Sequence, residues 1–416
     1  MMRDHLQVKI DGRLVGQLWL DERKNFCFQY DTSWLQHSRL PLSLSLPLQK
    51  APFLDDLSHP FFANLLPEEK IKVVLARNLG ISLHNDYGML ERIGGDCAGA
   101  VSLDIETAEL KQKTGEYRRL STEELATIIK ELPKRPFLAG EEGIRLSLAG
   151  AQKKLPIYYD EHDFHLTVGT APSNAIIKPP IEDLDNTVEN ETFCMALAKA
   201  IGLDVPESFI YRYGKEKVFV IKRYDRVQNG PSVQRLHQED FCQALGVLPE
   251  YKYEAEGGPS LAACFNLVRN NSTHAARDVL SLLNWVIFNV VIGNSDAHAK
   301  NISLLLLESG PVLAPFYDLL STRIYSHYGL TEKLAMKIGG ESDPSLIQKK
   351  HWQAFAEEVE IKPHLVLNRV IDIAKRIEAN RLKLFKGAFS QDHCDALFRL
   401  MQLIAEESKQ VINRVS

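Results

Sequence analysis

The sequence predicts an α+β fold in two lobes, with a β-rich front half and a helical rear half. Segments in which apolar and polar residues alternate are concentrated before residue 226, and helical patterns dominate after it. A chain of 416 residues also has room for two or three domains. We therefore expect a front unit at residues 1–105, the rest of the front lobe at 106–225, and an all-helical rear lobe at 226–416.

The front unit is expected to be rich in strands. Residues 6–30 alternate around an Asp-Gly pair at 11–12, which is a strong hairpin signal. Residues 39–48 (RLPLSLSLPL) alternate as well and predict a strand or an extended edge between prolines. Residues 59–80 have the pattern of a helix that ends at Gly80.

The next segment combines a turn, a strand and a connection. Residues 93–103 (IGGDCAGAVSL) predict a glycine-rich turn that enters a strand. A polar stretch from 106 to 142 has the composition of a connection. It contains a predicted helix at 121–131, where Ser121 and Glu124 resemble a capping box.

Alternating strands and helices continue along the chain. An amphipathic helix is predicted at 190–201 and stops at Gly202. The longest apolar run, 279–293, is too short to cross a bilayer and predicts a buried helix. Short strands are predicted up to Tyr159 and at 164–168, 175–178, 208–213 and 217–222.

Composition and charge limit the classes of function. A net charge of −5 and a pI near 6.3 argue against broad, unaided nucleic-acid binding, which needs an excess of Lys and Arg on one face. The six cysteines contain no C-x-x-C pair, so neither a zinc site nor a disulfide framework is expected. The N-terminus lacks the apolar core of a signal peptide. We therefore expect a cytoplasmic protein that makes no membrane contact.

A loop of small residues is the first candidate for ligand binding. Residues 147–154 (SLAGAQKK) precede a predicted strand at Leu155. Glycine and alanine let backbone N–H groups approach an anion such as phosphate. A bare turn has the same composition, so this loop alone is a weak signal.

The second candidate is Lys178, which closes an apolar strand. Many strands end in this way without any function. A predicted helix follows, however, and Glu189 and Glu191 lie near its start. A strand lysine held by a helix glutamate is the arrangement that directs an ammonium group at ATP phosphates. We expect Glu191 to be the partner, although carboxylates at a helix start also interact favourably with the helix dipole.

The third candidate is the polar loop at residues 293–301 (GNSDAHAKN), which lies between the apolar helix and the apolar strand 302–307. Asp296 and Asn301 are separated by four residues, the spacing of a phosphoryl-transfer loop. At this spacing a carboxylate accepts or orients the attacking hydroxyl, and an amide oxygen binds Mg²⁺. Lys300, between them, is expected to offset phosphate charge.

The fourth candidate is Asp318 in PFYDLLS, 17 residues after Asn301. An aspartate at this place is suited to chelate Mg²⁺ between phosphates. A helix N-cap is the alternative interpretation of Asp318. Because the four candidates occur together and in this order, they predict convergence on one magnesium-bound triphosphate.

These segments resemble the HipA proteins, a family of bacterial serine/threonine kinase toxins. That family carries S-V-A-G-A-Q, I-I-K-x-P, E-R-F-D, P-Q-E-D, D-x-H-A-K-N and P-F-Y-D-x-x-S in this order. The present chain carries S-L-A-G-A-Q at 147–152, I-I-K-P-P at 176–180, K-R-Y-D at 222–225, H-Q-E-D at 237–240, D-A-H-A-K-N at 296–301 and P-F-Y-D-L-L-S at 315–321. The front unit is similar too, at 41–48, 61–67 and 95–101. Leu148 and Lys222 replace a family valine and glutamate.

The resemblance implies a protein-kinase-like fold, ATP and Mg²⁺ as cofactors, and a role for each site residue. Asp296 is implied as the catalytic base, Asn301 and Asp318 as the Mg²⁺ ligands, and Lys178 as a contact to the ATP phosphates. The other implied nucleotide contacts are Ala149, Gly150, Ala151, Gln152, Lys153 and Lys154 in the phosphate-covering loop, Lys222, Arg223 and Tyr224 beside adenine, and His298, Ala299, Lys300 and Tyr317.

The resemblance also implies regulation and partners. The family serine that matches Ser147 is autophosphorylated, and a phosphate there adds about −1.5 to −2 charge to a loop that holds phosphates. Ser147 is therefore expected to act as an off-switch. The implied substrate is an aminoacyl-tRNA synthetase, glutamyl-tRNA synthetase first among them. The implied partner is a small HipB-like DNA-binding antitoxin, through which any DNA contact would be mostly indirect.

Two other functions remain as alternatives. A small-molecule kinase shares the spacing of Asp296 and Asn301, but such enzymes usually have histidine where this chain has Asn294, and they lack the front unit. A catalytically inactive nucleotide-binding module that supports an antitoxin is the second alternative. The intact set of Lys178, Asp296, Asn301 and Asp318 argues against inactivity.

Overall fold

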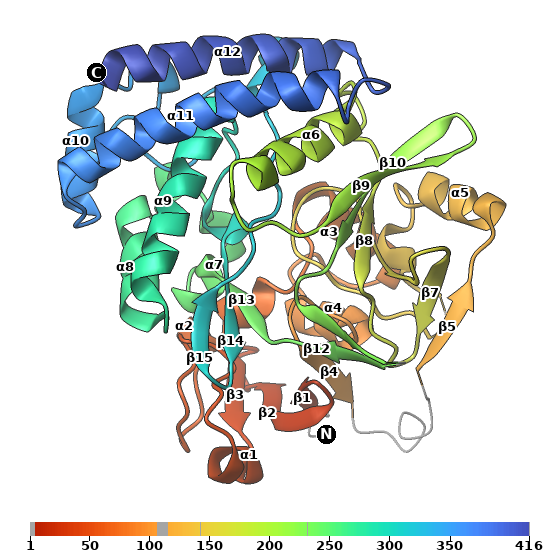
Figure 1. The fold of residues 1–416 in the computed structure, drawn as a ribbon. Coiled ribbons are helices and arrows are strands. Elements are labelled where there is room, and N and C mark those ends of the chain that lie inside the picture. Colours follow the sequence, from red (N-terminus) through yellow and green to blue (C-terminus); the bar gives the residue numbers. More distant parts are fainter. Residues whose placement is uncertain (1–4, 106–114, 142, 231, 416) are drawn as a thin grey trace.

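The chain folds around three hydrophobic cores, one in the front unit, one in the rest of the front lobe and the largest in the rear half. The structure is a computed structural model and describes residues 5–105, 115–141, 143–230 and 232–415. Figure 1 shows the front unit in red and orange, the larger front sheet in yellow and green beside it, and the C-terminal helices in blue across one side. The two-lobed α+β class is confirmed. The predicted boundaries at 105 and 225 stay predictions.

The front unit is built on a four-stranded antiparallel sheet. Its strand order is β3-β2-β1-β4, with β1 at Leu6–Ile10, β2 at Arg13–Leu20, β3 at Phe26–Tyr30 and β4 at Val101–Ile105. The predicted hairpin is confirmed, and its Asp11-Gly12 turn has positive φ at both residues, as a tight hairpin turn requires. In β1 the alternate residues Leu6, Val8 and Ile10 are buried.

Two predictions for the front unit need correction. Residues 39–48 form no strand but a turn, with one isolated bridge between Ser43 and Leu46. Prolines on both sides remove ladder donors, and the Leu44 N–H bonds the side chain of Glu239 instead. The helix predicted at 59–80 is two helices, α2 at Asp55–Ala63 and α3 at Glu69–Leu79, separated near Pro67. The predicted end at Gly80 is confirmed by its left-handed conformation.

The larger front sheet has six antiparallel strands in the order β5-β7-β6-β8-β10-β9. The capping box of Ser121 and Glu124 is confirmed at the start of α5, Thr122–Glu131. The stretch predicted as a connection also supplies an edge strand, β5. The strands lie at β5 Glu116–Arg119, β6 Leu155–Tyr159, β7 Phe164–Val168, β8 Ala175–Lys178, β9 Ser208–Tyr213 and β10 Glu216–Lys222.

The rear half is mainly helical but not all-helical, which corrects the prediction. A two-stranded ribbon (β11 Arg226–Asn229, β12 Ser232–Arg235) and a three-stranded sheet (β13 Gln238–Asp240, β14 Ser303–Leu307, β15 Gly310–Leu313) lie within it. Strand β14, which follows the polar loop, pairs antiparallel with β13 and β15, and this pairing satisfies the backbone N–H and C=O groups of these segments. The helices are α7 Phe241–Ala244, α8 Leu261–Asn271, α9 Ala275–Ile292, α10 Lys349–Glu358, α11 Pro363–Lys386 and α12 Asp395–Val415.

Helix α9 is the predicted buried helix and leads into the polar loop. Figure 1 shows it beneath α11 and α12, with which it is in contact. By length and composition it is the one helix in the described residues apolar enough to cross a membrane, yet 61% of it is buried inside the protein. Gly293 ends it in a left-handed conformation, so the chain turns sharply toward the front lobe.

Candidate active site

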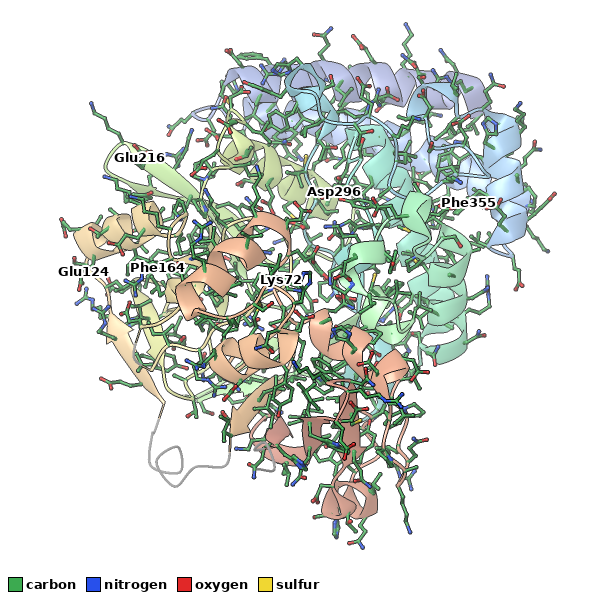
Figure 2. All side chains as sticks on the ribbon, turned by 180° about the vertical axis from the view of Figure 1, so that it is seen from behind. Lys72, Glu124, Phe164, Glu216, Asp296 and Phe355 are labelled. Atoms are coloured by element: carbon green, nitrogen blue, oxygen red, sulfur yellow. The ribbon has the colours of Figure 1, made fainter. Side chains whose placement is uncertain are left out.

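A cavity of about 690 Å³ lies between the front and rear halves. Figure 2 shows Asp296 near the middle of the molecule, between the helical part and the β-rich part. Almost every predicted nucleotide-site residue lines this cavity. Ala299 does not, because its side chain is fully buried, and neither does Ser147. The lining residues from the prediction are Ala149, Gly150, Ala151, Gln152, Lys153, Lys154, Lys178, Lys222, Arg223, Tyr224, Asp296, His298, Lys300, Asn301, Tyr317 and Asp318.

Lys178 is the charged centre of the cavity. It ends β8, and its Nζ lies 2.7 Å from Glu191 Oε1 and 2.5 Å from Asp318 Oδ1. The predicted pairing with Glu191, which lies on helix α6 (Thr187–Ala200), is present. Burial by itself would lower the pKa of Lys178, but the two carboxylates outweigh it and raise the pKa above its usual value. The ammonium therefore stays charged and its direction is fixed.

Asp318 is placed by an unusual backbone conformation. Its φ is +59°, in the left-handed region that aspartate tolerates better than most residues. Burial would raise its pKa, but Lys178 and then Lys154 lower it to about 2. Its side chain remains 32% exposed, and only Oδ1 is bonded to Lys178. An ionised oxygen is therefore open to the cavity.

The loop of small residues at 147–154, called the small-residue loop below, folds against its own last residue. Lys154 Nζ donates to the carbonyl of Ala149 at 2.6 Å. Gly150 has φ +105°, and a Cβ there would lie 2.7 Å from Lys154 Nζ, so glycine is required at this position. Burial and the nearby Lys178 lower the pKa of Lys154 to about 8. No carboxylate in the described residues lies within ion-pair distance of Lys154. Its positive charge is therefore available to an anion that binds in the cavity. Lys154, Lys178, Glu191 and Asp318 are called the cleft cluster below.

The polar loop is held by its own hydrogen bonds. Asn294 donates to Asn289 Oδ1 at 2.8 Å and accepts from the Asp296 N–H at 3.1 Å. Asn301 Nδ2 donates to the Asp296 carbonyl at 2.9 Å, which ties the two ends of the predicted spacing together. The Asp296 side chain is 49% exposed. This loop therefore presents a carboxylate to the cavity on a rigid backbone.

The residues present fit a magnesium ion held jointly with phosphates. No group of three or more His, Cys, Asp or Glu that could hold a metal occurs in the described part of the chain. Mg²⁺ in phosphoryl-transfer sites usually takes only one or two protein carboxylates plus substrate phosphates. Asp318 offers one ionised oxygen. The Asn301 amide nitrogen is occupied by the Asp296 carbonyl, which leaves its Oδ1 as the group suited to a cation.

Lys300 is not free in the cavity. Its Nζ lies 3.0 Å from Asp240 Oδ2, donates to Asn64 Oδ1, and lies 3.6 Å from Glu68 Oε1. Burial would lower the pKa of Lys300, but Asp240 and Glu68 raise it. The ammonium is thus bonded to Asp240 and to residues of the front unit, and its interaction with a transferring phosphate stays a prediction.

The predicted adenine segment is anchored by a second group of buried charges. Arg223 donates to both oxygens of Asp225, at 2.9 and 2.7 Å, and Arg226 donates to Asp96 Oδ1 at 2.8 Å. Asp96 also accepts from Ser173 Oγ at 2.6 Å. Asp96, Arg223, Asp225 and Arg226, called the hinge cluster below, are each less than 10% exposed. The Lys222 side chain points outward to Glu161 and Glu207.

Ser147 is the first residue of the small-residue loop and is fully buried. Its Oγ donates to the Leu65 carbonyl at 2.7 Å, and its N–H donates to the Asp96 carbonyl at 3.1 Å. Pro67 pairs with Gly150 in an isolated parallel bridge. Residues 64–68 of the front unit therefore hold the small-residue loop at 147–154. On their other side, Asn64 and Glu68 hold Lys300.

Sequence reasoning missed two groups in the site, Glu68 and Tyr253. Glu68 bonds Lys252 at 2.8 Å; burial would raise its pKa, but Lys300 and Lys252 lower it to about 2. Tyr253 donates to Asp296 Oδ1 at 2.7 Å. Glu68 directly follows the segment 61–67 that resembled the HipA family, and this adjacency was the available signal. Tyr253 lies in the segment between α7 and α8, where no sequence pattern could have indicated its role.

Comparison with known proteins places the chain in a family. The family model for the HipA-like C-terminal domain matches residues 146–381, and the model for the HipA N-terminal domain matches residues 6–104. The first match alone spans more than half of the chain. The chain belongs to the HipA family.

Individual HipA relatives and a solved structure agree with this placement. The protein Y4mE of Sinorhizobium fredii is 44% identical over 88% of this chain and 89% of its own length. The serine/threonine-protein kinase toxin HipA of Shewanella oneidensis is 33% identical over 89% of this chain and 87% of its own. The solved complex of Shewanella oneidensis HipA with HipB and operator DNA contains a chain that matches 99% of this one and is itself covered to 96%, with a TM-score of 0.81 and 28% identity.

Proposed function

We propose that this chain is an ATP- and Mg²⁺-dependent protein serine/threonine kinase and the toxin of a HipBA-type toxin–antitoxin pair. The observation that carries the proposal is the cavity in which Lys178 bridges Glu191 and Asp318 and which Asp296 and Asn301 also line. A fixed ammonium, an open ionised carboxylate and a second carboxylate on a rigid loop are the parts that phosphoryl transfer requires. The name of the Shewanella relative points to the same activity.

The division of labour follows from the contacts. Lys178 and Lys154 would bind the α-, β- and γ-phosphates, and the backbone of residues 149–154 would cover them. Asp296 would accept the proton of the acceptor hydroxyl as its oxygen forms a bond to the γ-phosphorus and the bond to ADP breaks. Asp318 and Asn301 would hold Mg²⁺. When bound, this ion neutralises charge on the phosphate oxygens.

The adenine base would lie beside residues 222–224. The hinge cluster holds this segment from behind, since Arg223 and Asp225 are bonded to each other and Arg226 to Asp96. The Lys222 side chain points away, so its contact to adenine would use backbone groups. This arrangement makes the replacement of the family glutamate by Lys222 compatible with ATP binding.

The substrate and the partner come from the relatives. We propose an aminoacyl-tRNA synthetase as the protein substrate, with glutamyl-tRNA synthetase as the first candidate, and a cytoplasmic site of action. The solved relative is a complex of HipA with HipB and operator DNA. We therefore propose a HipB-like antitoxin as partner, with DNA contact mainly through that antitoxin, as the net charge of −5 also favours.

Ser147 is proposed as the site of self-inactivation. Its hydroxyl is buried and donates to a backbone carbonyl. A phosphate at this position carries about −1.5 to −2 charge and has no hydrogen to donate to that carbonyl when fully ionised. A phosphorylated Ser147 would therefore not return to this position. The small-residue loop would lose its contact with the front unit, and ATP affinity would fall.

The test of the proposed function is transfer of labelled phosphate from Mg·ATP. Purified wild-type protein is incubated with cell extract, and labelled polypeptides are identified by mass spectrometry. We expect one predominant labelled protein besides the chain itself. Asp296→Asn should reduce labelling to a slow residual transfer while ATP binding is retained, and Ser147→Asp should weaken ATP binding. Labelling of a small molecule instead of protein would support the small-molecule kinase, and absence of Mg·ATP binding by the wild type would refute both kinase assignments.

A further inference from the structure

A loop between α7 and α8 brings a phenol group to the proposed catalytic base. Tyr253 Oη donates to Asp296 Oδ1 at 2.7 Å. Both residues line the cavity, and they are 43 positions apart in the chain. The contact is thus made by the fold and not by sequence proximity.

The backbone on both sides of Tyr253 is fixed. The Glu254 N–H donates to the Ala335 carbonyl at 3.2 Å, and its carboxylate accepts from the Lys337 N–H at 2.7 Å. The Gly258 N–H donates to the Tyr253 carbonyl at 2.9 Å. The loop is therefore joined to the segment that follows the polar loop and Asp318, and Tyr253 has little freedom to move along the cavity wall.

The ring of Tyr253 is fixed as well. Lys252 Nζ lies 5.3 Å from its centroid, and the His298 ring packs edge-on at 5.2 Å and 76°. Lys252 is itself bonded to Glu68 at 2.8 Å. A cation over one part of the ring and an imidazole edge at another restrict the ring to one orientation. The hydroxyl is therefore held toward Asp296 Oδ1.

This hydrogen bond makes the two carboxylate oxygens of Asp296 different from each other. Burial and the neighbouring Asp296 charge raise the pKa of Tyr253 above its usual value, so the phenol is a donor throughout the working range of pH. Oδ1 is occupied by this donor. Within the described residues Oδ2 has no hydrogen-bond partner, and the side chain is 49% exposed.

We propose that Tyr253 is a positioning residue that holds Asp296 Oδ1 and thereby aims Oδ2 at the acceptor hydroxyl. The inference rests on the proposed function, in which Asp296 takes the proton of that hydroxyl. Tyr253 touches neither nucleotide nor acceptor in this role. It acts through the carboxylate alone, because a misaligned base loses much of the advantage of a preorganised site.

The deciding variant is Tyr253→Phe, which removes one oxygen and keeps the ring between Lys252 and His298. Hydrogen bonds to charged groups are strong enough that we expect kcat to fall by about 10- to 100-fold. The KM for ATP, the affinity for Mg·ATP and the melting temperature should remain at wild-type values. The matched control is Tyr251→Phe, the same chemical change two positions earlier on a side chain that is 51% exposed, and it should leave all four quantities unchanged.

A double variant distinguishes positioning from a general structural effect. If Tyr253 acts only through the carboxylate, Tyr253→Phe should cause no further loss in the slow residual transfer of Asp296→Asn, measured in single turnovers. A kcat equal to or above wild type in Tyr253→Phe, or a parallel loss of ATP affinity, would overturn the inference. Failure of the wild type itself to transfer phosphate would instead reject the proposed function, and the inference would fall with it.

Discussion

The hinge cluster and the cleft cluster are two groups of buried charges built from the same chemistry and finished differently. In the hinge cluster each guanidinium also donates to backbone carbonyls, Arg223 to Cys97 and Arg226 to Gly99 and Ser173. In the cleft cluster Lys154 donates, among the residues that the structure describes, to the Ala149 carbonyl alone, and Asp318 keeps one oxygen open. The hinge cluster is saturated and closed, whereas the cleft cluster is unsaturated on the side of the cavity.

This difference separates charges that hold the fold from charges that wait for a ligand. A buried charge is costly unless its bonds are complete, so the hinge cluster is complete without any ligand. The cleft cluster would become complete only when phosphates and a cation enter. The two clusters should therefore respond in opposite ways to the loss of a single carboxylate.

Asp318→Asn should produce the largest effect, and on activity. The amide removes the open negative oxygen, so phosphoryl transfer should fall by about 100- to 1,000-fold or more. The free energy of unfolding should fall by no more than about 2 kcal/mol, because the pKa of Asp318 is lowered only to about 2, Lys178 keeps Glu191, and asparagine tolerates the left-handed backbone of position 318. Urea unfolding and labelled-phosphate transfer measure the two quantities. A large loss of stability with normal activity would contradict the assigned roles of the clusters.

Asp96→Asn should produce the opposite result. Burial would raise the pKa of Asp96, but Arg226 and Arg223 lower it well below its usual value, so the folded protein depends on the charged form. Removing that charge takes from Arg226 the carboxylate that lies 2.8 Å away and leaves it Asp225 at 3.0 Å, and it should cost about 3–5 kcal/mol of stability. Transfer per folded molecule, measured well below the melting temperature, should stay within a small factor of wild type. Equal stability of Asp96→Asn and wild type would show that the hinge cluster does not hold the fold.

The smallest effect concerns pH and Lys154. Its pKa of about 8 means that it is charged below pH 8 and loses its proton as the pH rises through this value. Bound phosphates favour the charged form, so ATP affinity should weaken above pH 8 by up to about tenfold per pH unit. Calorimetric titrations with Mg·ATP between pH 7 and 9 measure this. In Lys154→Met the affinity should be lower and should no longer follow this titration; an unchanged pH dependence would assign it to another group.

Much of the site could be predicted from the sequence because its motifs are local. Asp296 and Asn301 lie in one short loop, and backbone hydrogen bonds fix their relation. The strand that ends at Lys178 and the helix that carries Glu191 are also close in the chain, 13 residues apart. Local periodicity and spacing are sufficient for groups of this kind.

The remaining features depend on contacts between distant segments. Glu68 and Lys252 are 184 residues apart, and Asn64 and Lys300 are 236 apart. No periodicity encodes such a pairing, and the single helix predicted at 59–80 concealed the break between α2 and α3 at which the buried Glu68 lies. The partners that hold Lys300 were not predicted, because Asn64, Glu68 and Asp240 come from other parts of the chain. The strand predicted at 302–307 is present as β14 (Ser303–Leu307), but its pairing with β13 was not predicted, since β13 and β14 are far apart in sequence.

The contact of residues 64–68 with both the small-residue loop and Lys300 has a consequence for how natural variants are classified as active or inactive. A screen that inspects only the nucleotide motifs would score a change at Asn64 or Glu68 as neutral. These residues support two loops that are about 150 positions apart in the sequence, so such a change would inactivate an allele whose motifs are all intact. Inventories of functional copies in genomes should therefore count this stretch of the first hundred residues among the diagnostic positions.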